Sequence, residues 1–147
     1  RLKICTDLSH LNDKSFFGAI ERAEYPIASH SNSREICQVP RNLTDEQLKL
    51  IGEKNGLIGL CFYPKFLGGN AFEKIYENIC RLGNLGLENN IAIGSDFDGA
   101  DMPPELSDIS KVPDLYTYLE KRGISAETLK KIFYENAQNY FDKLSGI

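Results

Sequence analysis

The chain has 147 residues, of which 41% are hydrophobic and 26% are charged, and this composition is ordinary for one globular domain. It excludes a disordered, collagen-like or coiled-coil chain, and no apolar run approaches the roughly 20 residues that cross a bilayer. A net charge of -4, with scattered lysines and arginines, argues against a nucleic-acid partner.

Apolar runs and helix caps predict strands that alternate with helices. In chain order we expect a strand over residues 2–8, a helix over 12–24, a strand over 25–29, a helix over 44–55, a strand over 57–62, a helix over 71–82, a strand over 91–94, and helices over 114–121 and 125–141. Four strand–helix units with short connections indicate an α/β fold with a parallel sheet, in one domain that spans residues 1–147.

Local signals mark several of these elements. Thr44 with Gln47 three positions later is a capping box, and Ser125 is a predicted N-cap. The continuous apolar run over residues 57–62 is typical of a parallel strand that is buried on both faces. Four aromatic residues at helical spacing are expected in the core: Tyr76, Phe133, Tyr134 and Phe141.

The cysteines and the first residue bear on the origin of the chain. Four cysteines without CxxC spacing favour a reducing compartment, and we expect a cytoplasmic protein. Arg1 stands where an initiator methionine is usual and leads directly into the first predicted strand, so we expect a segment upstream of it.

The carboxyl ends of the predicted strands carry the polar residues that can do chemistry. In parallel α/β folds these ends form the active-site edge. The chain has only two histidines, His10 and His30, and each follows a predicted strand, while Asp96 follows the last one. Two imidazoles and a carboxylate in one mouth predict a metal site, with hydrogen-bonding groups of purely structural role as the alternative.

Two further aspartates, Asp7 and Asp98, each have two possible roles. Asp7 either orients His10, as metal-binding imidazoles usually require, or caps a neighbouring backbone N–H. Asp98 either joins the site or shapes the turn after Asp96. An EF-hand is excluded, because Ser107 stands at the twelfth position of the loop that starts at Asp96, where that motif places a glutamate.

Four blocks in this order resemble the second half of the renal (membrane) dipeptidases and their bacterial relatives. They are Asp7-Leu8-Ser9-His10, Ala28-Ser29-His30-Ser31-Asn32-Ser33, Arg41-Asn42-Leu43 and Gly94-Ser95-Asp96-Phe97-Asp98-Gly99, and the resemblance spans almost the whole chain. It implies a zinc-dependent enzyme that hydrolyses dipeptides on a TIM (β/α)8 barrel, with two zinc ions at the mouth.

The resemblance also implies roles for individual residues. His10 and His30 would bind one zinc ion, and Asp96 would be the catalytic acid and base. Arg41 would bind the substrate carboxylate or the tetrahedral intermediate, and Tyr63 would line the same mouth. Some relatives have a tyrosine where Phe66 stands, so a contact to that carboxylate would be missing here.

The family's first zinc is held by a His-x-Asp pair and a bridging glutamate from the first half of the barrel, and no histidine precedes His10. We therefore expect the carboxyl-terminal half of a dipeptidase, with strands five to eight, inactive by itself. It would associate with the missing amino-terminal half or with a second copy. The alternatives are a non-catalytic folded module and a barrel hydrolase that acts on another amide or ester.

Overall fold

Four parallel strands form the centre of the molecule, a computed structural model that describes residues 3–146. The strands are β1 (Thr6–Asp7), β2 (Pro26–Ala28), β3 (Leu57–Leu60) and β4 (Ile91–Ile93). They lie side by side in chain order, β1-β2-β3-β4, with Asp7 opposite Ile27, Ala28 opposite Ile58, and Leu60 opposite Ile93. The predicted α/β class and parallel sheet are confirmed.

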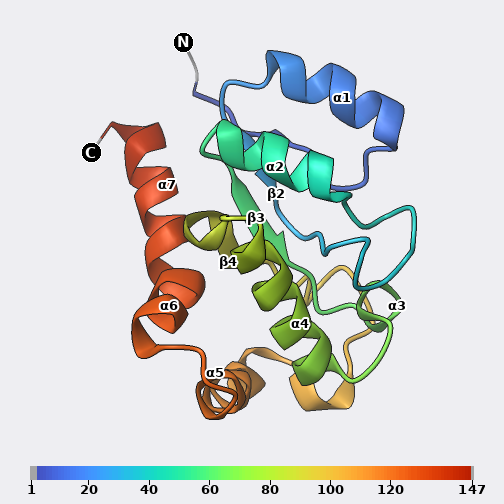
Figure 1. Ribbon diagram of the computed structural model, residues 1–147, viewed down its shortest axis with the longest axis vertical. Helices are drawn as coiled ribbons and strands as arrows, with labels where there is room; N and C mark the ends of the chain where they lie inside the picture. The colour runs from blue at the N-terminus through green and yellow to red at the C-terminus, as the bar shows by residue number, and fades with distance from the viewer. Residues whose placement is uncertain (1–2, 147) are drawn as a thin grey trace.

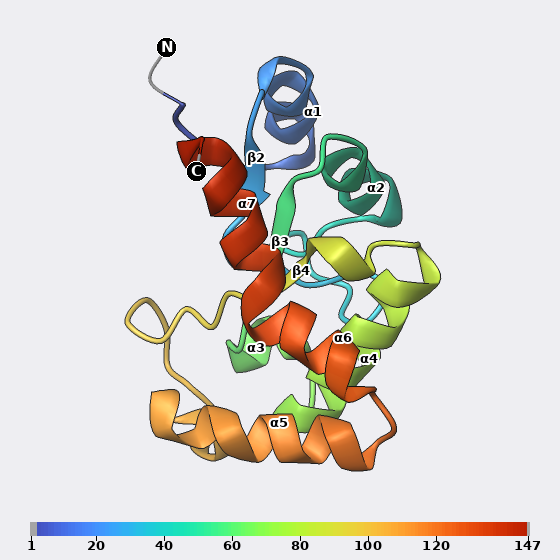
Figure 2. The ribbon, with the colours of Figure 1, turned by 90° about the vertical axis from the view of Figure 1, so that its left-hand side faces the viewer.

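Helices connect the strands and continue after the last one (Figure 1). They are α1 (Asp13–Arg22), α2 (Asp45–Glu53), α3 (Pro64–Leu67), α4 (Ala71–Asn84), α5 (Val112–Lys121), α6 (Ala126–Lys130) and α7 (Asn136–Ser145). Three short 3-10 turns are η1 (Glu88–Asn90), η2 (Pro104–Leu106) and η3 (Ile109–Lys111), and a π-helical turn, η4 (Lys131–Glu135), joins α6 to α7. Figure 2 shows α7 beside the strands and α5 at the far end of the molecule from α1.

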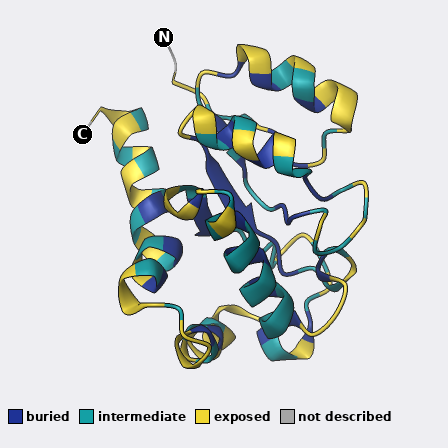
Figure 3. Cartoon of the chain, viewed as in Figure 1, coloured by how far each residue is buried: buried dark blue, intermediate teal, exposed yellow. Residues whose placement is uncertain are grey.

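The core lies between the sheet and the helices that follow each strand. All four residues of β3 are buried, as the continuous apolar run predicts. Helices α1, α2 and α4 lie next to one another in chain order and turn their apolar faces inward (Figure 1), with Phe16, Leu48 and Ile75 fully buried. Figure 3 shows the centre of the sheet as buried, the outer faces of α1 and α2 as largely exposed, and α4 as mostly intermediate.

The helix caps that the sequence predicts at Thr44 and Ser125 are present in the structure. The Thr44 hydroxyl accepts from the backbone N–H of Gln47, whose side chain accepts from the Thr44 N–H, which completes the predicted capping box at α2. The Ser125 hydroxyl accepts from the Thr128 N–H at the start of α6. Beyond α2, Asn55 turns the chain with a φ of 53°, and a Cβ on Gly56 would meet the Pro26 carbonyl oxygen at 2.5 Å.

Two elements differ from the sequence prediction. The described part of the first strand is only Thr6–Asp7, and the backbone is left-handed at Lys3, with a φ of 49°, so an extended strand could not begin there. The predicted strand residue Leu2 lies outside the described residues. The single C-terminal helix is instead α6, η4 and α7, since the π-turn changes the helical phase.

That change of phase corrects part of the predicted core. Tyr134 is 60% exposed and Phe141 is 45% exposed, so neither is a core residue. Phe133 and Tyr76 are partly buried and pack against the core, as predicted. Phe133 and Tyr134 lie within the π-turn and Phe141 follows it, so a regular 3.6-residue spacing does not describe this segment.

Helix α7 packs near the amino-terminal ends of the strands. The Asn136 side chain donates to the Ile91 carbonyl at the start of β4, and the Tyr140 hydroxyl donates to the Pro26 carbonyl at the start of β2. The carboxyl-terminal ends of the strands therefore remain the edge where the predicted site residues gather. Within residues 3–146, no helix is long and apolar enough to cross a membrane.

Candidate active site

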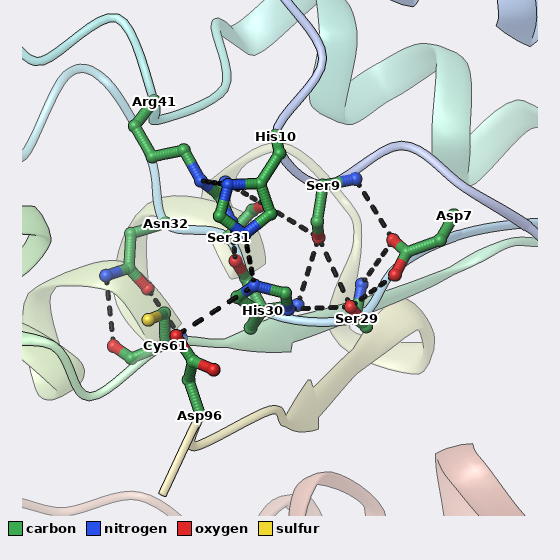
Figure 4. Close-up of polar contacts among 10 residues, drawn as sticks. All are labelled: Asp7, Ser9, His10, Ser29, His30, Ser31, Asn32, Arg41, Cys61 and Asp96. Carbon is green, nitrogen blue, oxygen red and sulfur yellow. Dashed lines mark hydrogen bonds and ion pairs between the residues drawn. The ribbon is translucent and has the colours of Figure 1, made fainter. Parts of the chain in front are cut away.

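The two histidines follow β1 and β2 and point toward one another (Figure 4). The backbone N–H of Leu8 donates to the Ile27 carbonyl at 2.8 Å, which extends the strand pairing up to the turn. His10 then adopts a left-handed backbone with a φ of 68°, a conformation that histidine tolerates better than most residues. The backbone N–H of His30 donates to the Ser9 hydroxyl at 3.2 Å and fixes the neighbouring turn.

The Nε2 atoms of His10 and His30 are 2.9 Å apart. Zinc–nitrogen distances are about 2.0–2.1 Å, so a single ion can contact both atoms. Among the described residues, no group of three or more histidine, cysteine, aspartate or glutamate side chains is placed to hold an ion. The two imidazoles could therefore supply two nitrogen ligands to a metal ion, and an ion held there would need further ligands from outside the described residues.

Asp7 orients His30 rather than His10, which corrects the sequence prediction. The Ser29 hydroxyl donates to Asp7 Oδ2 at 2.5 Å and lies 2.7 Å from Nδ1 of His30. Asp7 Oδ1 also accepts from the backbone N–H groups of Ser9 and Ser29, at 3.0 and 3.1 Å. The carboxylate thus caps neighbouring backbone N–H groups, which is the second of its two predicted roles. It contacts the ring of His30 through Ser29, because β1 pairs with β2 and brings Asp7 next to the segment that carries His30.

Arg41 reaches back from the loop after β2 onto both histidine segments. Its Nε donates to Nδ1 of His10 at 3.2 Å, and its terminal nitrogens donate to the Ser31 hydroxyl and the His30 carbonyl, each at 3.0 Å. Its guanidinium carbon also lies 5.2 Å from the centroid of the Phe66 ring. These contacts hold a half-buried cation at the mouth of the sheet.

Asp96 follows β4 on the other side of His30. One of its carboxylate oxygens is 3.9 Å from Nε2 of His30, and the two side chains are 20% and 18% exposed. The backbone of Asp96 is left-handed, with a φ of 72°, and its carbonyl accepts from the Gly99 N–H. A Cβ on Gly99 would meet Asp96 Oδ1 at 2.2 Å, so the glycine leaves room for this carboxylate orientation.

A cavity of about 480 Å³ opens at this mouth. Its lining comprises His10, Tyr63, Phe66, Asp96, Asp98, Gly99, Ala100 and Asp101. Tyr63 packs edge-on against Phe66, with 4.8 Å between ring centroids. A larger hollow of about 530 Å³ lies near the amino-terminal ends of β3 and β4, but neither histidine lines it, so the mouth remains the candidate site.

Burial and local hydrogen bonds set the charges at the mouth. Burial lowers the pKa of His30, and the nearby Asp96 carboxylate offsets that effect only in part, so the imidazole is neutral at neutral pH. For Asp7, burial favours the neutral acid, but the hydrogen bonds from Ser29 and Ser9 outweigh it and lower the pKa. The site therefore pairs a neutral imidazole with an ionised carboxylate.

The sequence prediction did not single out the two serines that flank His30. Ser29 links Asp7 to the ring, while Ser31 accepts from Arg41 and is 1% exposed. The sequence signal that could have pointed to these serines is the run Ser29-His30-Ser31 directly after a predicted strand. The sequence prediction did not single out Asn42 either. Its buried side-chain amide donates to the carbonyls of Cys37 and Phe66 and connects the loop that carries Arg41 to α3.

A family model of the membrane dipeptidases, peptidase family M19, matches residues 1–145. The chain belongs to the membrane dipeptidase family. This family consists of metallodipeptidases, which fits two imidazoles that converge at the end of a parallel sheet.

Sequence relatives agree with this assignment. The chain is 36% identical to an uncharacterized protein of Klebsiella pneumoniae encoded in the pqqA 5' region, over 92% of this chain and 53% of that protein. It is 34% identical to an uncharacterized dipeptidase of Schizosaccharomyces pombe, over 92% of this chain and 35% of the relative. The chain thus spans about half or less of the length of these membrane dipeptidase relatives.

The chain likewise matches less than half of the length of two similar solved structures. The crystal structure of a metallopeptidase, dipeptidase AC, matches with a TM-score of 0.92 and 31% identity, over 99% of this chain and 45% of that one. A metallopeptidase of Rhodobacter sphaeroides, liganded with a phosphinate mimic of the dipeptide L-Ala-D-Ala, matches with a TM-score of 0.90 and 31% identity, over 97% and 43%. These membrane dipeptidases are TIM-barrel-like, and four consecutive strand–helix units are consistent with part of such a barrel.

Proposed function

We propose that this chain forms strands five to eight of a zinc dipeptidase barrel and contributes part of a binuclear zinc site. The observation that carries the proposal is the 2.9 Å separation of the His10 and His30 Nε2 atoms, at the carboxyl end of a parallel sheet. Coverage of about half of the dipeptidase structures supports the partial barrel. The family match supports dipeptide hydrolysis as the reaction of the assembled enzyme.

His10 and His30 would hold one of the two ions, with the remaining ligands supplied by the other half of the barrel. Zinc, when bound, acts as a Lewis acid that polarises a peptide carbonyl and acidifies water. A neutral imidazole with an unprotonated nitrogen suits this role, and the lowered pKa of His30 supports it for that residue.

Asp96 would hold and move the proton in the reaction. Its carboxylate opens into the mouth cavity beside His30, where it can take a proton from the attacking water and deliver it to the leaving amine. The 20% exposure of its side chain leaves it accessible to substrate without full hydration.

Arg41 and Tyr63 would recognise the substrate. The guanidinium of Arg41 offers a planar fork for a carboxylate, and its stacking on Phe66 fixes the plane of that fork. Tyr63 lines the mouth cavity next to Phe66, the ring over which the guanidinium of Arg41 lies. A free dipeptide with a terminal carboxylate is the substrate that this arrangement fits.

The proposal includes association of this half-barrel with another chain. β1 and β4 are the outer strands of the described sheet, and each pairs with one neighbour only. Unpaired edges of parallel strands favour association, either with the amino-terminal half of the barrel or with a second copy. The four free cysteines suit a reducing compartment, and we place the protein in the cytoplasm.

Light scattering coupled to size exclusion, with hydrolysis assays on L-Ala-D-Ala in the presence of zinc, tests this proposal. The isolated 147-residue chain is expected to associate and to leave the dipeptide intact, and activity is expected when the amino-terminal half is added. A monodisperse monomer would contradict the association, and zinc-dependent hydrolysis by the isolated chain would contradict its role as a partial site.

A further inference from the structure

We propose that the two histidines are held in opposite tautomers without metal, so that metal binding changes the tautomer of His10 alone. Asp7 and Ser29 act as positioning residues that preset His30, while Arg41 holds His10 in the form that cannot bind. This inference rests on the proposed metal site, and it names the residues that regulate loading of that site.

The donor and acceptor pattern around Ser29 fixes the tautomer of His30. An ionised carboxylate only accepts hydrogen bonds, so the 2.5 Å contact to Asp7 takes the single proton of the Ser29 hydroxyl. A competing acceptor, the Ser9 hydroxyl, is farther away, at 3.4 Å. The Ser29 oxygen must therefore accept at its 2.7 Å contact with His30, which places the proton on Nδ1 and leaves Nε2 with a free lone pair.

Arg41 imposes the opposite tautomer on His10. A guanidinium is a donor only, so the 3.2 Å contact from Arg41 Nε requires a lone pair on Nδ1 of His10. The neutral ring then carries its proton on Nε2, which points at the free Nε2 lone pair of His30 at 2.9 Å. Every contact in this series then has one donor and one acceptor. Hydrogen bonds are donated in one direction, from the cation of Arg41 through both imidazole rings and the Ser29 hydroxyl to the carboxylate of Asp7 (Figure 4).

The two histidines therefore differ in whether Nε2 can bind a metal ion without a change of tautomer. His30 already presents an unprotonated Nε2, with its other nitrogen held by Ser29 in the way that metal-binding imidazoles usually require. His10 must lose the proton from Nε2 and carry one on Nδ1, which removes the acceptor for Arg41 Nε. Two N–H donors cannot face one another, so Nε of Arg41 must turn away from His10, while its terminal nitrogens can keep their contacts to Ser31 and the His30 carbonyl.

Long-range proton–nitrogen NMR correlations of the imidazole rings test this directly in the 147-residue chain. Only two histidines contribute signals, and their assignment follows from His10→Gln and His30→Gln variants. Without metal, at a pH where both rings are neutral, we expect the Nδ1–H form for His30 and the Nε2–H form for His10. On addition of zinc, His10 is expected to change to the Nδ1–H form while His30 keeps its tautomer.

Matched variants separate positioning from general structural damage. Ser29→Ala should give a mixture of tautomers at His30 and weaken zinc binding about 10–100-fold. Ser29→Thr, which keeps the hydroxyl, should restore both, and Asp7→Asn should act like Ser29→Ala. Ser31→Ala removes a hydroxyl that contacts Arg41 but not the His30 ring, and it should leave the tautomer of His30 unchanged.

The same spectra can overturn the inference. An Nε2–H form for His30 without metal, or equal tautomer mixtures in the chain and in Ser29→Ala, would contradict the role of Ser29. An unchanged His10 tautomer on zinc saturation would contradict the switch. Because the metal-free tautomers are read without turnover, an assembled enzyme that is inactive although this chain shows the expected tautomers would count against the proposed function and leave this inference standing.

Discussion

The guanidinium carbon of Arg41 lies 5.2 Å from the centroid of the Phe66 ring, although Arg41 belongs to the loop after β2 and Phe66 to helix α3. Asn42 explains this proximity, because its buried side-chain amide donates to the Phe66 carbonyl at 2.8 Å and to the Cys37 carbonyl at 2.9 Å. The backbone next to Arg41 is thereby tied to the segment that carries the ring. This arrangement restricts the orientation of the Arg41 guanidinium plane, which suits its proposed contact with a substrate carboxylate.

Arg41→Lys in the assembled enzyme is expected to raise KM for dipeptides with a free carboxylate. A lysine keeps the charge but loses the planar fork, and loss of a charge-assisted hydrogen bond of about 1.5–3 kcal/mol corresponds to roughly a tenfold to hundredfold weaker interaction. Amidated dipeptides, which lack the carboxylate, should be affected much less. Equal changes for both substrates would mean that Arg41 only supports the structure of the mouth.

Asp96→Asn in the assembled enzyme is expected to lower kcat by roughly 10²–10⁴, the usual contribution of a positioned acid or base. The asparagine keeps the shape of the side chain and cannot accept the proton. Zinc content should be almost unchanged, because His10 and His30 remain in place. A variant with normal turnover would remove the catalytic role of Asp96, and zinc loss in proportion to activity would indicate a ligand instead.

Gly59→Ala is expected to destabilise the fold, by about 1–3 kcal/mol as for other overpacked sites. A Cβ at this position in β3 would lie 2.2 Å from the Ser29 carbonyl oxygen and 2.9 Å from the Gly94 Cα, both of them backbone atoms. Gly18→Ala is the matched control, since its Cβ meets nothing within 4 Å in α1, and it should stabilise by about 0.5–1 kcal/mol. Chemical unfolding of both variants is the measurement, and equal effects would contradict the packing at β3.

The ion pair between Asp13 and Arg34 is expected to make stability depend on pH. Hydrogen bonds from Arg34 hold the pKa of Asp13 below its ordinary value of 3.8. The ionised form therefore stabilises the folded chain fully above that value, and the contribution disappears as the pH falls through the lower folded pKa. Arg34 also donates to the carbonyls of Pro40 and Asn42, so this pair supports the loop that carries Arg41.

Urea unfolding of the chain and of Asp13→Asn at a series of pH values measures this contribution. The difference in unfolding free energy should be constant near neutral pH and shrink below about 3.8. An Arg34→Met background, which removes the main cause of the lowered pKa and leaves the hydrogen bond from Gln47, should reduce the pH dependence of the difference. A difference that stays constant into the acid range would show that the carboxylate charge is not involved.

The sequence predicts those features of this fold that depend on short-range patterns. The capping box at Thr44, the cap at Ser125 and the buried run of β3 all act between neighbouring residues, and each is found where expected. The strand-end positions of His10 and His30 follow from the same periodicity.

The remaining features depend on contacts between residues far apart in the chain. Asp7 meets Ser29 only through the pairing of β1 with β2, so the sequence alone suggested the adjacent His10 as its partner. The exposure of Tyr134 depends on a π-turn, which no simple 3.6-residue pattern announces.

The account depends most directly on a metal shared by His10 and His30, and calorimetric titration of the isolated chain with zinc measures it. We expect one weakly held zinc per chain, with binding abolished in His10→Gln and in His30→Gln and retained in Asp96→Asn. Zinc binding that survives both histidine substitutions, or a chain that binds no zinc under conditions where both imidazoles are neutral, would contradict the central claim.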